Sequence, residues 1–192
     1  MSRNLYLCSQ SPRRAQLLQQ LGLTFELVNA PIEETALPKE SPHSFVVRMA
    51  VEKALSGFNK LAGHDIWVLG ADTIVLKEGR VFGKPRSEYE AIQMLSALSG
   101  GEHQVLSALA IVNDGQVFSE CNLTKVWFQD LNESEMTSYW ATGEPQGKAG
   151  AYAIQGLGAK FIERIEGSYS GVMGLPLFEL DQCLIASQYY LE

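Results

Sequence analysis

Asp72 is the residue whose surroundings point most clearly to chemistry. It lies inside the apolar run VLGADTIVL, where a carboxylate is costly to bury unless it is hydrogen-bonded, paired or close to a metal. We expect the residues Gly70-Ala71-Asp72-Thr73 to interrupt a strand, so that Asp72 acts from the point of interruption. For an isolated aspartate, the alternative is that it only caps a local turn.

A cation follows Asp72 at a spacing that a hairpin would close. Glu78-Gly79 favours a tight turn between two strands. Antiparallel pairing across this turn would bring Lys84, in the sequence GKP, towards Asp72. Taken alone, Lys84 is an ordinary surface residue.

Further charged residues extend this pattern. Glu33 and Glu34 lie in a polar, proline-containing loop, and Lys53 lies at the edge of the apolar face of the helix expected after Ser41-Pro42. Carboxylates can hold a divalent ion, while lysine and arginine bind phosphate oxygens. The pattern therefore indicates a polyphosphate bound through a divalent cation.

Two arginines stand where a helix is expected to begin, in the sequence SQSPRR. Ser11 is a good N-cap and Pro12 suits the first helical position, so Arg13 and Arg14 fall in the first turn. A cation at this positive end of a helix costs about 0.3–1 kcal/mol. The cost disappears if a bound anion is shared between the arginines and the free N–H groups. The alternative is that both side chains lean into solvent or pair with nearby carboxylates.

The scaffold for these residues is predicted from capping and turn signals. Helix starts are expected at Ser41-Pro42, Ser87-x-x-Glu90 and Asn132-x-x-Glu135, and the clearest hairpin turns at Asn113-Asp114-Gly115. Helices and strands alternate, but hairpins are frequent. We therefore expect an α/β fold with a mixed, largely antiparallel central sheet flanked by helices.

Composition narrows the class of protein. The 192 residues suffice for one well-cored domain or two tightly joined lobes, and we expect one folding unit. The formal net charge of -7 disfavours a nucleic-acid partner. No apolar run approaches a membrane span and the N-terminus lacks a signal-peptide layout, so we expect a cytoplasmic protein with no membrane partner. Its three cysteines are widely separated and form no disulfide framework or zinc motif.

Six short motifs in order resemble one family. The stretches SQSPRR, EE at 33–34, EKA at 52–54, GADT, GKP and KAGAYAIQG are similar to those of the Maf family of nucleoside triphosphate pyrophosphatases, over essentially the whole chain. The resemblance is strongest to the subgroup acting on dTTP and UTP. It implies a single domain over residues 1–192, with two lobes around one cleft, similar to inosine triphosphate pyrophosphatases. It also implies cleavage between the α- and β-phosphates, yielding a nucleoside monophosphate and pyrophosphate.

The resemblance assigns roles to individual residues. Asp72 takes the position of the catalytic carboxylate, which accepts a proton from the attacking water. A divalent cation, Mg²⁺ or Mn²⁺, is expected on Glu33 and Asp72, with Glu34 as a further candidate ligand.

The remaining site positions concern phosphate and base. The residues implied in phosphate binding are Ser9, Arg13, Arg14, Lys53 and Lys84. Those implied in nucleotide selectivity are Arg13, Thr73 and Gln155. The Gln155 carboxamide places a donor beside an acceptor, which can complement the N3–H and a carbonyl of uracil or thymine, but a flipped amide could also follow cytosine.

Alternative functions are also compatible with the sequence. The family is linked to septum formation and division arrest, so a nucleotide-binding regulator with incidental turnover is an alternative. Within the enzyme reading, the related subgroup acting on methylated GTP, UTP and CTP, or a house-cleaning role on modified pyrimidine nucleotides, is a further alternative. The family also suggests a homodimer.

Overall fold

A computed structural model describes residues 4–61 and 64–190 of the chain. The strands are β1 (Asn4–Cys8), β2 (Phe25–Leu27), β3 (Ile66–Lys77), β4 (Arg80–Phe82), β5 (Glu102–Asn113), β6 (Gln116–Phe128) and β7 (Ile162–Glu166). The α-helices are α1 (Pro12–Gln20), α2 (Pro42–Leu61), α3 (Glu88–Leu98), α4 (Glu133–Ala141), α5 (Tyr169–Met173) and α6 (Leu177–Ala186). Two 3-10 helices, η1 (Ala149–Ala151) and η2 (Leu157–Phe161), lie between α4 and β7.

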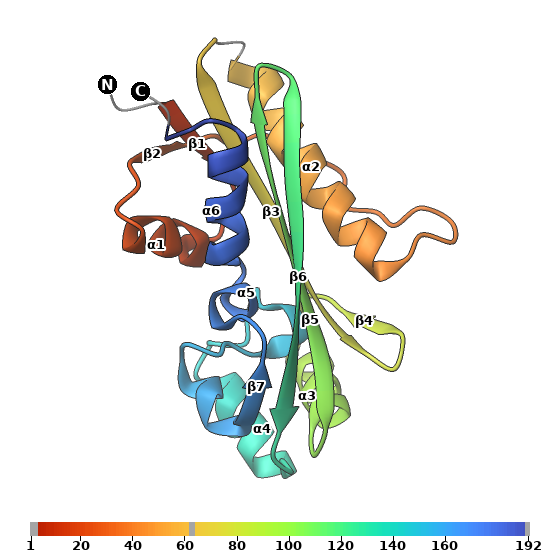
Figure 1. The fold of residues 1–192 in the computed structure, drawn as a ribbon. Coiled ribbons are helices and arrows are strands. Elements are labelled where there is room, and N and C mark those ends of the chain that lie inside the picture. Colours follow the sequence, from red (N-terminus) through yellow and green to blue (C-terminus); the bar gives the residue numbers. More distant parts are fainter. Residues whose placement is uncertain (1–3, 62–63, 191–192) are drawn as a thin grey trace. The chain divides into compact units, whose positions relative to one another are not determined.

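The strands form a mixed sheet in the order β2-β1-β3-β5-β6-β7, with β4 paired to β3. Strand β1 is parallel to both β2 and β3, whereas the β3–β4 and β6–β7 pairs are antiparallel. The predicted α/β class with a mixed sheet flanked by helices is therefore confirmed (Figure 1). Within the described ranges, no helix combines the length and the apolar character that crossing a bilayer requires.

The chain divides into two compact units. Unit 1 comprises Met1–Asp72, Ser107–Asn122 and Gly174–Glu192, and unit 2 comprises Thr73–Leu106 and Leu123–Met173. Strands β3, β5 and β6 each contribute residues to both units. The single domain with a cleft between two lobes, which the resemblance implies, stays a prediction.

In unit 1, helix α2 packs directly on β3. A Cβ on Gly70 would collide with the Ala50 carbonyl oxygen and the Ala54 amide nitrogen of α2, and a Cβ on Gly57 would lie 2.9 Å from Val68. Only glycine permits so close an approach of helix and strand. Side chains alternate along a strand, so Val68, Gly70 and Asp72 share the face of β3 that α2 covers.

This packing corrects the prediction that Gly70-Ala71-Asp72-Thr73 interrupts a strand. Strand β3 runs without a break from Ile66 to Lys77. The glycine that suggested an interruption instead accommodates the backbone of α2. Asp72 therefore lies within a continuous strand.

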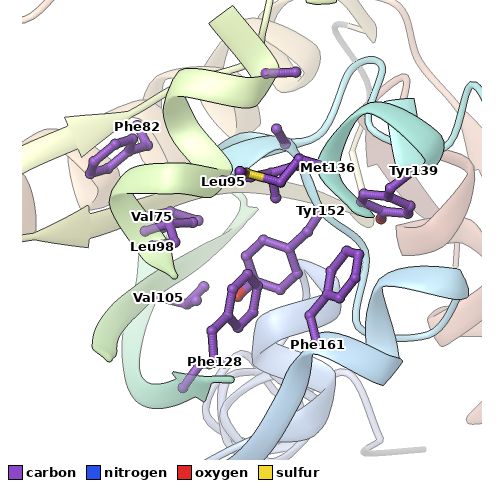
Figure 2. Close-up of a cluster of buried hydrophobic side chains, with 13 residues drawn as sticks. Val75, Phe82, Leu95, Leu98, Val105, Phe128, Met136, Tyr139, Tyr152 and Phe161 are labelled. Carbon is purple, nitrogen blue, oxygen red and sulfur yellow. The ribbon is translucent and has the colours of Figure 1, made fainter. Parts of the chain in front are cut away.

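In unit 2, the core is built from aromatic and aliphatic side chains of α3, α4 and the adjoining strands (Figure 2). Phe128 contacts the rings of His103, Tyr152 and Phe161, and Tyr139 packs edge-on against Phe161. The rings of His103 and Phe128 both pack edge-on against Tyr152, which belongs to the segment that precedes Gln155.

The predicted caps at Ser87 and Asn132 and the two predicted hairpin turns are confirmed. Ser87 accepts the Glu90 N–H at 3.2 Å, and Asn132 with Glu135 forms a reciprocal capping box. The hairpin turns at Glu78-Gly79 and Asp114-Gly115 have positive φ at both residues, as type I′ turns require. The β3–β4 ladder ends at Val75–Phe82, before it reaches the positions of Asp72 and Lys84.

Candidate active site

Lys53 joins two carboxylates in unit 1. Its Nζ lies 2.7 Å from Asp72 Oδ1 and 2.8 Å from Glu34 Oε1. The apolar residues Met49, Ala50 and Ala54 fix the buried face of α2, so Lys53 projects from the edge of this face towards β3. The side chains of Lys53 and Asp72 are 13% and 12% exposed, and that of Glu34 is 50% exposed.

The surroundings of Asp72 satisfy the requirement that its burial imposes. A carboxylate in this position needs a partner, and the ammonium of Lys53 supplies one. The ion pair also holds the Asp72 carboxylate in one orientation, which a general base requires. The pair engages Oδ1 of the carboxylate.

The loop before α1 holds a polar cluster around Ser9. The Ser9 Oγ accepts hydrogen bonds from the Ser11 N–H at 3.2 Å and from Arg14 Nη1 at 3.0 Å. This hydroxyl therefore accepts two hydrogen bonds and keeps its own proton to donate. Ser11 occupies the N-cap position and Pro12 begins α1 as predicted, but the Ser11 side chain makes no capping hydrogen bond.

The two arginines of α1 differ in their surroundings. Arg14 is buried, and its Nε donates to the Gly174 carbonyl at 2.8 Å. Arg13 is half-buried. This difference makes Arg14 a structural link between α1 and the segment before α6, in addition to its contact with Ser9.

Electrostatics connect these residues. Burial lowers the pKa of the Arg14 guanidinium, the Asp72 carboxylate opposes this shift, Arg13 adds to it, and Glu34 opposes it. Burial also lowers the pKa of Arg13. Unit 1 thus gathers three cations, Arg13, Arg14 and Lys53, with two carboxylates, an arrangement in which further anionic charge is electrostatically favoured.

Glu33 lies apart from this ion-pair network. Its Oε1 accepts the Thr35 hydroxyl at 3.1 Å on an exposed part of the loop. Glu34 rather than Glu33 shares Lys53 with Asp72. Among residues 4–61 and 64–190, no group of three or more histidine, cysteine, aspartate or glutamate side chains is arranged to hold a metal ion. However, the convergence of Glu34 and Asp72 on one ammonium shows that a single cation can contact both carboxylates, and their oxygens suit a hard divalent ion.

The other predicted site residues lie in unit 2. Thr73 is half-buried on β3, whereas Lys84 and Gln155 are exposed. The Gly150 N–H donates to the Gly83 carbonyl at 3.0 Å, so the residue before Lys84 is tied to the glycine-rich segment that leads to Gln155.

Two supporting residues outside the predicted site, Glu144 and Arg48, hold two of these segments. Glu144 accepts the Tyr139 hydroxyl at 2.6 Å and the N–H groups of Leu157 and Gly158 at 2.9 Å, next to Gln155. Arg48 donates a hydrogen bond to the Thr35 carbonyl in the loop that carries Glu34. The i, i+4 spacing of Arg48 and Glu52 was a signal for one of these contacts, but no sequence pattern links Glu144 to Leu157 and Gly158.

The fold and this site define a class of protein: a mixed α/β domain with a cation-rich, carboxylate-containing site suited to a phosphorylated ligand. A model of the Maf-like protein family matches residues 4–187. The chain belongs to the Maf family.

Relatives are similar over nearly the whole chain. The dTTP/UTP pyrophosphatase of Hydrogenovibrio crunogenus is 62% identical over 192 residues, covering all of both chains. The dTTP/UTP pyrophosphatase of Vibrio cholerae is 47% identical, covering 94% of this chain and 96% of its own. Among solved structures, a nucleoside-triphosphatase / dITP/XTP pyrophosphatase of Mycobacterium abscessus is 15% identical with a TM-score of 0.45, covering 98% of this chain and 96% of its own.

Proposed function

We propose that this protein is a nucleoside triphosphate pyrophosphatase that hydrolyses dTTP and UTP to the nucleoside monophosphate and pyrophosphate. The observation that carries the proposal is the Asp72–Lys53–Glu34 ion-pair network beside the arginines of α1. The family and the names of the relatives support the substrate class. The cytoplasmic location and the homodimer stay predictions.

Asp72 acts as the general base. It accepts a proton from a water molecule whose oxygen forms a bond to the α-phosphorus, while the bond from this phosphorus to the α,β-bridging oxygen breaks. The electron pair of that bond leaves with pyrophosphate. Lys53 holds the Asp72 carboxylate in one orientation.

Cationic and hydroxyl groups hold the phosphates. Arg13 and Lys84 bind phosphate oxygens, and the Ser9 hydroxyl donates its proton to one of them. Arg14 contributes by holding Ser9 and by adding positive charge. Among the predicted residues, Thr73 and Gln155 recognise the pyrimidine, together with Arg13.

The carboxylates of Asp72 and Glu34 would hold a divalent cation, Mg²⁺ or Mn²⁺, with Glu33 as the other predicted ligand. Such a cation offsets phosphate charge and lowers the pKa of a coordinated water. The ion pairs with Lys53 use one oxygen of each carboxylate, Asp72 Oδ1 and Glu34 Oε1.

The test is pyrophosphate release from the standard NTPs and dNTPs with Mg²⁺ or Mn²⁺, beside the variants Asp72→Asn and Asp114→Asn. Asp114 is an exposed residue of a hairpin turn with φ of 45°, a conformation that asparagine also adopts readily, so this matched control should keep full activity. We expect release from dTTP and UTP, with a loss of at least about a thousandfold in Asp72→Asn. Nucleotide binding without release in the wild type would contradict the proposal and favour a regulator.

A further inference from the structure

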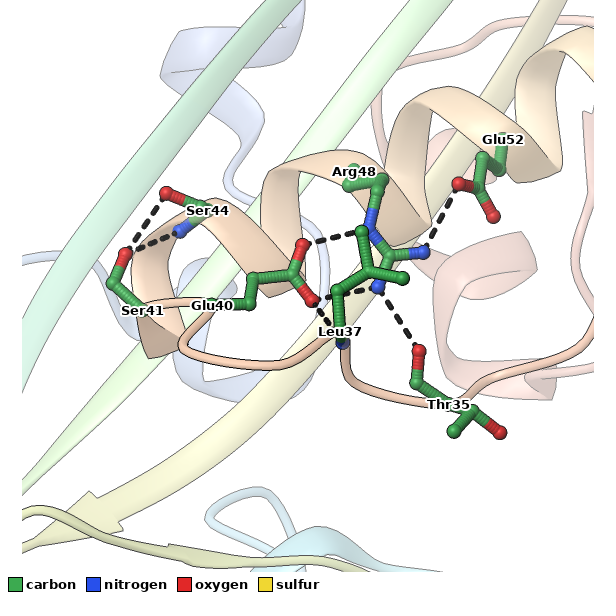
Figure 3. A network of polar contacts seen from close by, with 7 residues as sticks. All are labelled: Thr35, Leu37, Glu40, Ser41, Ser44, Arg48 and Glu52. Carbon is green, nitrogen blue, oxygen red and sulfur yellow. Dashed lines mark hydrogen bonds and ion pairs between the residues drawn. The ribbon is translucent and has the colours of Figure 1, made fainter.

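Arg48 of α2 binds three parts of the polar loop and its flanking helix (Figure 3). Its Nε lies 2.6 Å from Glu40 Oε1, and its Nη2 lies 2.7 Å from Glu40 Oε2. The same Nη2 donates to the Thr35 carbonyl at 3.0 Å, and Nη1 lies 3.0 Å from Glu52. Glu40 in turn accepts the Leu37 N–H at 2.9 Å. We refer to these contacts as the Arg48 clamp.

The loop has little else to fix its position. Residues 33–39 are all exposed, so no side chain in this stretch anchors the loop in a hydrophobic core. Lys39 adopts a positive φ of 62°, a conformation that non-glycine residues rarely adopt. The polar contacts of Arg48 and Glu40, together with the Glu34–Lys53 ion pair, therefore determine where the backbone of this stretch lies.

The clamp acts next to the ion-pair network of the candidate site. Arg48 holds the carbonyl of Thr35, and the preceding residue is Glu34, whose carboxylate contacts Lys53. Arg48 and Lys53 both belong to α2. One helix thus fixes the backbone beside Glu34 and also presents the ammonium that Glu34 contacts.

We propose that Arg48 is a positioning residue for the pyrophosphatase reaction: through Thr35 and Glu40 it holds Glu34 against the Lys53–Asp72 pair. This inference rests on the proposed function. The guanidinium is required because a planar fork can bind Glu40 and Thr35 together, whereas the single ammonium of a lysine cannot reproduce that geometry.

The test compares Arg48→Met, Arg48→Lys and the matched control Arg86→Met. Arg86 also binds a glutamate four residues away with two nitrogens, but it belongs to unit 2 and is 87% exposed. We expect kcat on dTTP to fall about tenfold to a hundredfold in both Arg48 variants, because small displacements of a site residue have effects of this size. The KM should stay within about twofold, since the phosphate-binding residues of the α1 loop are untouched, and Arg86→Met should match the wild type.

A double-mutant cycle shows whether Arg48 acts through Glu34. If it does, Arg48→Met should cause at most about a twofold further loss of kcat when introduced into Glu34→Gln. Multiplicative losses in the double variant, or full activity in Arg48→Lys, would overturn the inference.

A measurement without turnover separates this inference from the proposed function. Deuterium uptake by the peptide covering residues 33–41 should rise in Arg48→Met and not in Arg86→Met. If the wild type cleaves no nucleotide, the proposed function fails and the positioning role fails with it, while increased uptake would still show that the clamp orders the loop. If the wild type is active and uptake is unchanged in Arg48→Met, only the inference fails.

Discussion

The segment that carries Glu33 and Glu34 and the segment that carries Gln155 are held by different kinds of interaction. The first, in unit 1, is exposed over residues 33–39 and is fixed by the charged groups of the Arg48 clamp. The second, in unit 2, is fixed from inside by hydrogen bonds to Glu144 and to the buried Tyr139, whose hydroxyl also accepts the Ala153 N–H at 3.1 Å.

This difference bears on what each segment can do. Ion pairs are weakened by salt and by protonation, so the loop with Glu34 can adjust its position at low energetic cost. The Tyr139 hydroxyl is buried, and a buried hydroxyl is costly to leave without its partners. Unit 1 thus has an adjustable support beside the predicted catalytic carboxylate, and unit 2 has a stiffer support beside the predicted base-recognition residue.

The largest expected effect is a loss of stability at low pH caused by the buried contact between His103 and Tyr152 in unit 2. His103 Nε2 lies 2.9 Å from the Tyr152 hydroxyl, and burial, with Lys77 nearby, lowers the pKa of His103 from 6.5 to about 3. In the unfolded chain His103 binds a proton below about pH 6.5, whereas in the folded chain it stays neutral down to about pH 3. The free energy of unfolding should therefore fall by about 1.4 kcal/mol per pH unit across this window.

Urea unfolding between pH 7 and pH 4 checks this prediction. The slope should be smaller in His103→Gln and unchanged in His43→Gln, since His43 is exposed. Because His103→Gln could unfold outright, the ring resonances of His103 in the wild type should also be followed by NMR. A midpoint near pH 6.5 would contradict the buried, neutral state.

Removal of Glu144 should have the next largest effect. Glu144→Ala leaves the Tyr139 hydroxyl and the Gly158 N–H without their acceptor, so we expect a loss of roughly 2–4 kcal/mol in the free energy of unfolding. The preference for UTP over CTP should also narrow, since Gln155 lies on the released segment. Urea denaturation measures the free energy of unfolding, and the ratio of the kcat/KM values for UTP and CTP measures the preference. The exposed Glu163 provides a control in Glu163→Ala, and equal stability of the two variants would argue against the internal support.

A methyl group placed beside Tyr139, at position 158, should lower the free energy of unfolding by a smaller amount. In Gly158→Ala the new Cβ would lie 2.6 Å from the Tyr139 hydroxyl oxygen and 2.9 Å from the Ala153 carbonyl oxygen. Displacing these groups should destabilise the protein by about 1–3 kcal/mol. In the control Gly83→Ala, the Cβ meets no atom within 4 Å. Thermal unfolding of both variants checks the difference, and a neutral Gly158→Ala would show that the segment is looser than we infer.

The contrast between the two supports also shows what sequence patterns can predict. The caps at Ser87 and Asn132 and the turn at Asp114-Gly115 depend on neighbouring residues, and their residue types alone predicted them correctly. In contrast, Arg14 meets the Gly174 carbonyl 160 positions away in sequence. Such contacts arise only when the whole chain folds.

The central ion pairs illustrate the same limit. The cost of burying Asp72 predicted a partner, but several lysines and arginines could have supplied it, and only the packing of α2 on Gly70 selects Lys53. The wrong prediction of an interrupted strand has the same origin. In a sequence, a glycine that is required for the close approach of a helix looks the same as a glycine that ends a strand.

The smallest expected effect is local opening of the Arg48 clamp in acid. Hydrogen bonds from Arg48, aided by the Leu37 N–H, lower the pKa of Glu40 from 4.5 to about 2. A depressed pKa means that this contribution to folding is complete above about pH 5 and is lost as the pH falls from there towards 2. The loop should loosen in this window in addition to the global loss of stability that His103 causes, and 1 M salt should produce a milder loosening at neutral pH, because screening weakens ion pairs that water reaches.

The protection factor of the Leu37 amide, its exchange rate relative to the intrinsic rate at the same pH, measures this opening, because its N–H is bonded to Glu40. In Glu40→Gln this protection factor should already be low at neutral pH and should not fall further in acid. Glu90→Gln is the matched control: Glu90 binds Arg86 and accepts the Arg86 N–H at 2.8 Å, but it belongs to unit 2. If the protection factor of Leu37 in the wild type were independent of both pH and salt, the loop with Glu34 would be as firmly held as the segment with Gln155, and the distinction between the two supports would fail.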